Sequence, residues 1–303
     1  MKVLIVGLGS IARKHIQALQ KIDPEVACYA LRSAVDAKVL PGIQNIYHIQ
    51  EIASLGLDFA IISNPTALHQ QTIEALIPYH LPLFIEKPVF DHLAAGSVIE
   101  AIQQHHIQTY VACNLRFLGC IQFVKTYIQN KQVNEVNAYC GSYLPDWRPG
   151  QDFRKVYSAN KEMGGGVHID LIHEIDYLYW LFGAADQVRV TRTSQSSLAI
   201  SAIDYANYVM QYPGFSAHVV LNYYRKDAKR TLEILLEAGT LSVDLLQNQV
   251  MYQGETIYTS GKTITDTYED QMIFFISHIL KNKEVFNPIE EAFEILTLCI
   301  AND

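Results

Sequence analysis

MKVLIVGLGSIARKHIQALQKI (residues 1–22) starts with a short apolar run, passes through two glycines and continues with apolar residues at helical spacing. This order predicts a β-strand, a tight turn and an α-helix, the first half of a βαβ unit. The turn is a GxGxxA fingerprint: its first glycine shapes the turn, and its second lets a pyrophosphate approach the backbone. The alternative is an ordinary tight turn. The residues expected at the pyrophosphate are Gly7, Gly9, Ser10, Ile11 and Ala12.

Further apolar segments continue this pattern to about residue 118. They lie at 26–31, 57–65, 81–88 and 108–114. Helical stretches separate them, one of them expected over 91–105. Strands that alternate with helices predict a doubly wound parallel sheet of the Rossmann type, with ligands at the carboxyl ends of the strands. We therefore assign residues 1–118 to a dinucleotide-binding domain.

The pattern changes after residue 118. One helix is expected over about 118–130, another follows three glycines at 164–166, and two more close the chain near 267–281 and 288–300. The segments from about 187 to 258 are Tyr- and Val-rich runs with tight turns and no helices between them, which is typical of antiparallel strands. Residues 119–303 are therefore expected to form an α+β domain on a large, mostly antiparallel open sheet.

Composition limits the class of protein. The 303 residues, 50% hydrophobic and 18% charged, are enough for two domains with ordinary cores. A formal net charge of −8 argues against nucleic-acid and anionic-membrane partners, because both attract basic surfaces. The five cysteines are scattered and form no CxxC pair, as expected for reduced thiols in a cytoplasm. No apolar run approaches the roughly 18 residues of a membrane span. We expect a cytoplasmic protein.

The end of the second predicted strand bears on the choice of cofactor. An acidic residue that holds the adenosine ribose of NAD is expected there, about 20 residues past the glycines. The sequence instead reads ALRS at residues 30–33. Arg32 and Ser33 could pair with and hydrogen-bond a 2′-phosphate, which favours NADP over NAD. The alternative is that Arg32 is a solvated loop residue.

Residues 164–176, GGGVHIDLIHEID, concentrate titratable groups behind three glycines. On the single buried helix predicted here, Asp170, His173 and Asp176 stand three residues apart and share one face. A histidine titrates in the range that a general base needs, and an aspartate could fix its tautomer. The simpler alternative is a helix N-terminus whose acids compensate the helix dipole.

Five motifs occur in order along the chain. They are GLGSIA (7–12), SNPTALH (63–69), EKP (86–88), NLRF (114–117) and GGGVHIDLIHEIDYLYWLFG (164–183). Together they resemble the glucose-fructose oxidoreductase / inositol dehydrogenase family, Gfo/Idh/MocA, over nearly the whole chain. The stretch from SYLPDWRP (142–149) to DFRKVYSA (152–159) is similar to a subgroup of sugar dehydrogenases of surface-polysaccharide biosynthesis.

The resemblance implies a nicotinamide dinucleotide on the first domain and a substrate laid against it by the second. Lys87 is the lysine of the EKP motif, and Glu86 is expected at the nicotinamide-side ribose. The catalytic helix motif of the family matches Asp170, His173 and Asp176. The other residues matched to the cofactor pocket are Asn64, Pro65, Thr66, His69, Asn114 and Arg116. Candidate substrate-binding residues are Lys87, Arg116, Arg148, Arg154, Tyr157, Asp170 and His173.

Two departures from the family pattern bear on activity. The first aspartate and the histidine are commonly four positions apart, whereas here they are three apart. Ile172 stands where the subgroup has a serine, and His168 where an apolar residue is usual. Either could narrow the substrate or mark lost activity. His168 and His173 lie about 140° apart around a helix and form no HExxH motif, so no metal site is expected.

We expect an NAD(P)-dependent oxidoreductase that transfers a hydride between nicotinamide and a secondary hydroxyl or keto group of a sugar or sugar derivative, including nucleotide-linked sugars. His173 would remove the hydroxyl proton, and Lys87 would stabilise the developing alkoxide. One alternative is a non-catalytic dinucleotide-binding regulator, and another is a metal-dependent hydrolase or isomerase that uses the cluster at 168–174. The resemblance also implies a homodimer or homotetramer formed through the C-terminal sheet.

Overall fold

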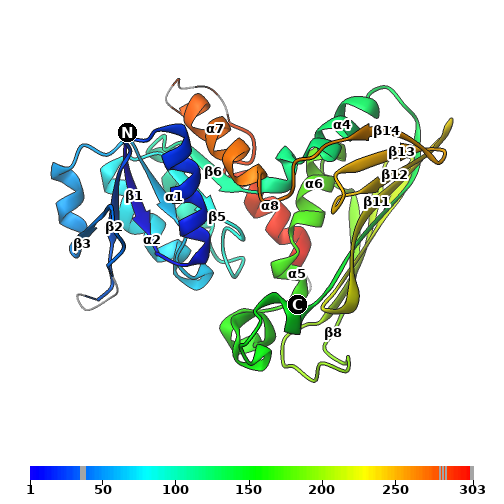
Figure 1. Ribbon diagram of the computed structural model, residues 1–303, viewed down its shortest axis with the longest axis horizontal. Helices are drawn as coiled ribbons and strands as arrows, with labels where there is room; N and C mark the ends of the chain where they lie inside the picture. The colour runs from blue at the N-terminus through cyan, green and yellow to red at the C-terminus, as the bar shows by residue number, and fades with distance from the viewer. Residues whose placement is uncertain (35–38, 280, 282, 284, 301–303) are drawn as a thin grey trace. The chain divides into compact units, whose positions relative to one another are not determined.

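The computed structural model describes residues 1–34, 39–279, 281, 283 and 285–300. The chain divides into two compact units, coloured in Figure 1 by residue number. The first unit contains Met1–Cys113 and Tyr268–Leu296, and the second contains Asn114–Thr267 and Thr297–Asp303. The first unit is therefore completed by a segment from near the end of the chain.

The first unit is built on a sheet of six parallel strands. They are β1 (Lys2–Val6), β2 (Ala27–Leu31), β3 (Ile43–Ile46), β4 (Phe59–Ile62), β5 (Leu83–Glu86) and β6 (Thr109–Ala112). Their order is β3-β2-β1-β4-β5-β6, and all neighbouring pairs are parallel. This order reverses direction between β1 and β4, as in the doubly wound sheet predicted from the sequence.

Burial explains why these strands could be recognised. The strands β4, β5 and β6 are buried at every position, so each is a continuous apolar run. The edge strand β3, of sequence IQNI, was not predicted, because only Ile46 in it is buried and two of its four residues are polar. The helices of this unit are α1 (Ser10–Ile22), α2 (His69–Leu76), α3 (Gly96–Gln104), most of α7 (Thr267–Ile279) and the first part of α8 (Ile289–Ile300).

Helix α3 begins five residues later than predicted. The helix was expected from residue 91, but the chain forms a turn there, in which the backbone N–H of Ala94 donates to Nδ1 of His92 at 3.1 Å. Such a local side-chain bond offers the backbone an alternative to the helix. The prediction was therefore wrong for residues 91–95.

The second unit is built on a sheet of eight strands in the order β14-β13-β12-β11-β7-β10-β9-β8. The strands are β7 (Val133–Tyr143), β8 (Gln187–Thr193), β9 (Tyr205–Tyr212), β10 (Phe215–Asn222), β11 (Tyr224–Leu236), β12 (Gly239–Asp244), β13 (Gln249–Tyr252) and β14 (Glu255–Thr259). β7 and β10 run parallel, and the other neighbouring strands run antiparallel. The predicted mostly antiparallel sheet is confirmed.

One face of this sheet is apolar and covered. Along β9, Ala206, Tyr208 and Met210 are buried and alternate with half-buried residues. Two helices lie against the sheet: α5 (Val167–Asp170) contacts β9 and β10, and α6 (His173–Phe182) contacts β7. A further helix, α4 (Gly119–Tyr127), packs near β13 and β14. The buried residues of the alternating pattern therefore point to the side of the sheet that the helices cover.

The single helix predicted after the glycine run is wrong, because the chain forms two helices, α5 and α6. Leu171 and Ile172 separate them, and Leu171 has φ −101° and ψ 29°. The N–H of Ile172 bonds to the carbonyl of Ile169, an i→i−3 bond that tightens the chain at the junction. Asp170 therefore ends one helix and His173 begins the next, so the argument that they share a face of one helix does not hold.

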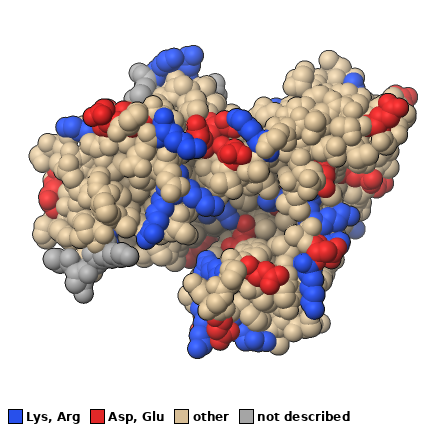
Figure 2. Space-filling view, in the orientation of Figure 1, with Lys and Arg blue, Asp and Glu red and all other residues tan. Residues whose placement is uncertain are grey.

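Surface and thiol features agree with the composition. Acidic and basic side chains are interspersed in small groups on the face shown in Figure 2, with broad uncharged areas between them. No disulfide joins the five cysteines, all of which lie in the described part of the chain and are buried. Among the described residues, no helix has both the length and the apolar character that crossing a membrane requires.

Candidate functional site

The turn after β1 leaves space that only glycines can leave. Gly7 has φ +92°, and a Cβ there would lie 2.4 Å from the backbone nitrogen of Asn64. A Cβ on Gly9 would meet no atom of the described residues within 4 Å. The first glycine is thus required by close backbone packing, and the second faces open space where a ligand can approach the chain.

The N-terminus of α1 is suited to an anion. Gly9 occupies the N-cap position, and no side chain of the described residues caps the helix there. Ser10 and Ile11 open the first turn without an acidic group, and Ala12 is fully buried against the unit's core. The uncapped N–H groups and the positive end of the helix dipole favour a phosphate at this position.

The segment after β4 is fixed by the buried ring of His69. Nδ1 of His69 lies 3.1 Å from the carbonyl oxygen of Val89, and Nε2 lies 3.1 Å from that of Asn64. Burial lowers the pKa of His69, so the ring is neutral near neutral pH. Between Asn64 and His69, Pro65 leads into a 3₁₀ turn that starts at Thr66. His69 therefore holds this loop in place, and it has almost no exposed surface.

The carboxyl end of β5 carries Glu86 and Lys87. Glu86 is buried, and its Oε1 lies 2.5 Å from Nε2 of His15 in α1. Its Oε2 accepts a hydrogen bond from the backbone N–H of Lys87 at 3.2 Å. Lys87 itself is half-buried. Since β1 and β5 are strands of one parallel sheet, their carboxyl ends lie at the same edge of the first unit.

The residues that bear on cofactor choice lie at the end of β2. Arg32 follows the strand, is half-buried, and places Nη1 3.4 Å from Oδ1 of Asn45 on β3. Ser33 is exposed beside it. A cation and a hydroxyl therefore lie at the position where an acidic residue would hold an NAD ribose.

Two residues matched to the cofactor pocket, Asn114 and Arg116, are anchored inside the second unit. Nδ2 of Asn114 donates to Oγ1 of Thr267 at 2.7 Å. Arg116 is fully buried, and its Nε and Nη2 donate to the two carboxylate oxygens of Asp176 at 2.9 and 2.7 Å. Asp176 is also fully buried. This bidentate pair fixes α6 to the short 3₁₀ turn Asn114–Phe117.

A second ion pair joins α6 to the sheet. Nη2 of Arg230 on β11 donates to Oε2 of Glu174 at 3.0 Å, and its Nε donates to Oε1 at 2.5 Å. Burial opposes the charge of Arg230, but the adjacent Glu174 carboxylate raises its pKa above the ordinary value. Glu174 and Asp176 therefore both serve to attach the helix that His173 begins.

Asp170 is held by two tyrosines. The hydroxyl of Tyr157 donates to Oδ1 at 2.8 Å, and that of Tyr223 donates to Oδ2 at 2.5 Å. Burial raises the pKa of both tyrosines, and the Asp170 charge raises them further, so both hydroxyls stay protonated and donate. The indole of Trp147 packs edge-on against Tyr223 with ring centroids 5.3 Å apart.

The remaining candidate residues differ in exposure. His173 is half-buried at the first position of α6. Arg148 and Arg154 are exposed in a run of short 3₁₀ turns between Leu144 and Met163. Arg148 lies near enough to Tyr157 to lower its pKa slightly against the larger effects of burial and Asp170. The exposed pair could meet an anionic group of a ligand.

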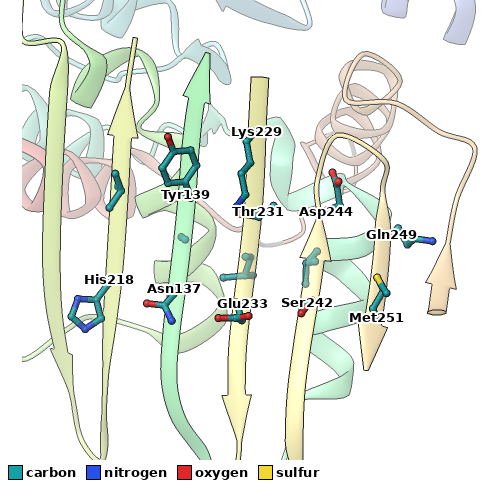
Figure 3. A pocket seen from close by; sticks show the side chains of 14 residues that line it. Asn137, Tyr139, His218, Lys229, Thr231, Glu233, Ser242, Asp244, Gln249 and Met251 are labelled. Atoms are coloured by element: carbon teal, nitrogen blue, oxygen red, sulfur yellow. The ribbon is translucent and has the colours of Figure 1, made fainter. Parts of the chain in front are cut away.

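The open face of the large sheet carries a groove of about 410 Å³ (Figure 3). Its lining mixes charged, polar and apolar side chains: Lys229 and Glu233 stand on β11, next to Tyr139 on β7 and Asp244 on β12. No group of three or more His, Cys, Asp or Glu in the described part of the chain is arranged to hold a metal ion.

Sequence reasoning missed two residues of these sites. His15 contacts Glu86, and Tyr223 contacts Asp170. His15 left a signal, because a histidine occupies the buried stripe of α1 that otherwise holds Ala12, Ile16 and Leu19. Tyr223 left none, since Asp170 lies 53 residues away along the chain.

Comparisons with known proteins cover most of the chain. Residues 1–112 match the oxidoreductase family with an NAD-binding Rossmann fold, and residues 121–242 match the GFO/IDH/MocA C-terminal domain. Among curated proteins, the uncharacterized oxidoreductase YrbE of Bacillus subtilis is 24% identical over 190 residues, which is 59% of this chain and 53% of that protein. Glucose-6-phosphate 3-dehydrogenase of the same organism is 23% identical over 197 residues, or 60% and 53%.

The chain thus matches about half the length of these curated relatives. Among solved structures, UDP-N-acetylglucosamine 3-dehydrogenase GnnA from Acidithiobacillus ferrooxidans superposes with a TM-score of 0.81 at 18% identity. That superposition covers 99% of this chain and 95% of the other. It shows a shared fold over the whole described length. With both domain patterns matched in order, the chain belongs to the Gfo/Idh/MocA family of oxidoreductases.

Proposed function

We propose that this protein is an NAD(P)-dependent oxidoreductase that transfers a hydride between nicotinamide and a secondary hydroxyl or keto group of a sugar or sugar derivative. The observation that carries the proposal is the uncapped N-terminus of α1 beside the open position of Gly9. A dinucleotide pyrophosphate fits a helix N-terminus that follows the first strand of such a sheet. Lys87 stands at the same edge of that sheet.

We propose NADP as the preferred cofactor. Arg32 and Ser33 supply a charge and a hydroxyl at the end of β2, where a 2′-phosphate would lie. The cofactor, when bound, accepts or donates the hydride. Gly7, Gly9 and the first turn of α1 would hold its pyrophosphate, and the loop fixed by His69 would lie beside it.

For the reaction, we assign His173 as the general base and Lys87 as the cation that stabilises the alkoxide. His173 lies half-buried at a helix start, so part of its ring is accessible to a substrate. Of the two aspartates, Asp170 is the better candidate to act beside His173, because it is half-buried and bonded to neutral hydroxyls, whereas Asp176 is fully buried in an ion pair with Arg116. The hydroxyl group of Tyr157, which donates to Asp170, can also contact a sugar.

The proposed substrate class is a hexose or hexosamine that carries a phosphate or nucleotide group. The names of two relatives, a glucose-6-phosphate 3-dehydrogenase and a UDP-N-acetylglucosamine 3-dehydrogenase, both point to the 3-hydroxyl of a glucose-type ring. The exposed Arg148 and Arg154 could meet the anionic group. Trp147 offers an aromatic surface close to the Asp170 cluster.

We also propose that the protein is a homodimer or homotetramer that covers the groove in Figure 3 with a second copy. The mixture of Lys229, Glu233 and Asp244 on that face allows opposite charges to meet across a twofold axis. Light scattering at micromolar concentration tests this. A strictly monomeric protein would contradict it.

The test of the function is reduction of NADP⁺ and NAD⁺ by the purified protein over a panel of hexoses, hexose phosphates and UDP-linked hexosamines. We expect turnover with a phosphorylated or UDP-linked sugar and a lower KM for NADP⁺ than for NAD⁺. Dinucleotide binding with no turnover in either direction would instead support a non-catalytic regulator. Absence of dinucleotide binding would refute the proposal.

A further inference from the structure

A buried pair links the helix of the glycine turn to the strand end that carries Lys87. The ring of His15, in the second turn of α1, is fully buried, with Nε2 2.5 Å from Oε1 of Glu86. The other oxygen of Glu86 accepts the backbone N–H of Lys87. The Glu86 carboxylate is therefore held by His15 of α1 on one side and by the backbone of Lys87 on the other.

Packing alone does not account for a histidine here. The ring meets Phe84 edge-on at 4.8 Å and Tyr268 at 5.9 Å, so an apolar side chain would fill the same space. Burying a carboxylate costs several kcal/mol unless a partner compensates, and such pairs add little stability over apolar ones. Their better-attested use is to fix one arrangement of the chain. Among the described residues, Nδ1 of His15 meets no hydrogen-bond partner, so the polar contact of the ring is with Glu86.

We propose that His15 is a positioning residue, which sets Glu86 and, through it, the backbone of Lys87 against the bound dinucleotide. The inference rests on the proposed function, since it assigns His15 a part in the same site. His15 lies six positions after Gly9, on the helix whose N-terminus receives the pyrophosphate. One rigid helix therefore locates both the pyrophosphate and the strand end with the lysine.

The chemistry of the contact defines the substitutions that test it. The Nε2–H tautomer of His15 donates to the carboxylate of Glu86. A glutamine places an amide N–H near the same position, whereas a leucine fills the space without a donor. His15→Gln should therefore still position Glu86, and His15→Leu should not.

The primary measurement is the Kd of NADPH and NADH by fluorescence titration, which needs no knowledge of the sugar. We expect His15→Leu to raise the Kd by about tenfold, the scale of one lost hydrogen bond to a charged group, and His15→Gln to stay within about threefold. The double variant His15→Leu/Glu86→Gln should be no worse than the poorer single variant, because both changes break one contact. Once a substrate is known, kcat should fall further in His15→Leu than in His15→Gln.

A control separates positioning from general loss of stability. Gln271, a buried side chain of α7 in the same unit, accepts from the hydroxyl of Tyr110 and makes no hydrogen bond to Glu86 among the described residues. Gln271→Leu should change the melting temperature without changing the Kd. If the wild type binds neither dinucleotide, the proposed function fails. If the wild type binds and His15→Leu binds equally well, or the effects of the double variant are additive, the positioning role is refuted.

Discussion

The turn at residues 7–12 and the segment at residues 164–176 both carry functional candidates, and they are built in opposite ways. The turn works by what it lacks: Gly7 lets two backbone segments touch, and Gly9 leaves open space above a helix end. The α5–α6 segment works by what it contains, since Asp170, Glu174 and Asp176 are each held by side chains from elsewhere in the second unit.

Under the proposed function, this difference separates binding from proton transfer. Backbone N–H groups at a helix end bind an anion with no titratable side chain, so the turn should be insensitive to pH. In the helical segment, the acids are used as attachments, and His173 is the half-buried titratable group at the start of α6. Substitutions in the turn should therefore affect binding, and those in the segment should affect turnover or folding.

The sharpest test of the turn is Gly9→Val. Side-chain bulk would occupy the open space, so we expect binding of NADPH and NADH to fall below detection by fluorescence titration. Gly96→Val is the matched control, because Gly96 also faces open space but lies in α3, away from the turn. Equal binding by both variants would mean that the turn holds no ligand.

His173→Ala tests the segment. We expect kcat to fall by about 10²- to 10⁴-fold, the usual contribution of a general base. Dinucleotide affinity and the unfolding midpoint should remain close to wild type, because His173 is only half-buried. Steady-state kinetics with the best sugar of the panel provide the measurement. Unchanged kcat would leave the acid–base role to Lys87 alone.

Asp176→Asn should act on stability instead. It leaves the fully buried Arg116 beside a neutral partner, and breaking a buried ion pair costs about 3–5 kcal/mol. Urea unfolding measures the loss. The control is Asp227→Asn, which breaks an exposed pair with Arg225 and should leave the unfolding curve unchanged. A stable Asp176→Asn protein with reduced kcat would instead place Asp176 in the reaction.

Arg32→Ala sharpens the account of the first unit. Loss of a charge-assisted contact should weaken NADPH binding by about 1.5–3 kcal/mol and leave NADH binding nearly unchanged. Titrations with both dinucleotides, repeated at raised salt, provide the comparison. Equal losses for the two would remove the basis for preferring NADP.

The smallest expected effect concerns His69, whose pKa burial lowers from an ordinary value of 6.5. Below that pH the unfolded chain binds the proton more readily than the folded protein does. Stability from the neutral ring is therefore complete above about 6.5 and declines as pH falls toward the lowered folded-state value. Thermal unfolding across this range should show a shallower acid slope in His69→Gln than in wild type. Parallel slopes would contradict the assignment.

The two regions also differ in how well the sequence predicted them. The turn and the strands β4, β5 and β6 were predicted correctly because their signal is local: a glycine pattern and continuous apolar runs. The break between α5 and α6 was not predicted. The contacts of Asp176 with Arg116, of Glu174 with Arg230 and of Asp170 with Tyr223 span 60, 56 and 53 residues of the chain, so periodicity carries no trace of them. Sequence also named Asp176 for catalysis without showing that Arg116 engages it.

The segment Tyr268–Leu296 has a consequence for biosynthesis. It supplies Phe275, whose ring packs on Phe59 and Phe84 at 5.1 and 5.3 Å, and Asn287, whose Nδ2 donates to the carbonyl of Val111 at 2.8 Å. A ribosome therefore synthesises residues 114–267 of the second unit before the core of the first can close. Until then, the apolar side of β4 and β5 remains exposed, and chaperones recognise such transiently exposed surface. A fragment ended at residue 113 would keep that exposure permanently, so expression of the first unit alone calls for a fusion that restores residues 268–296.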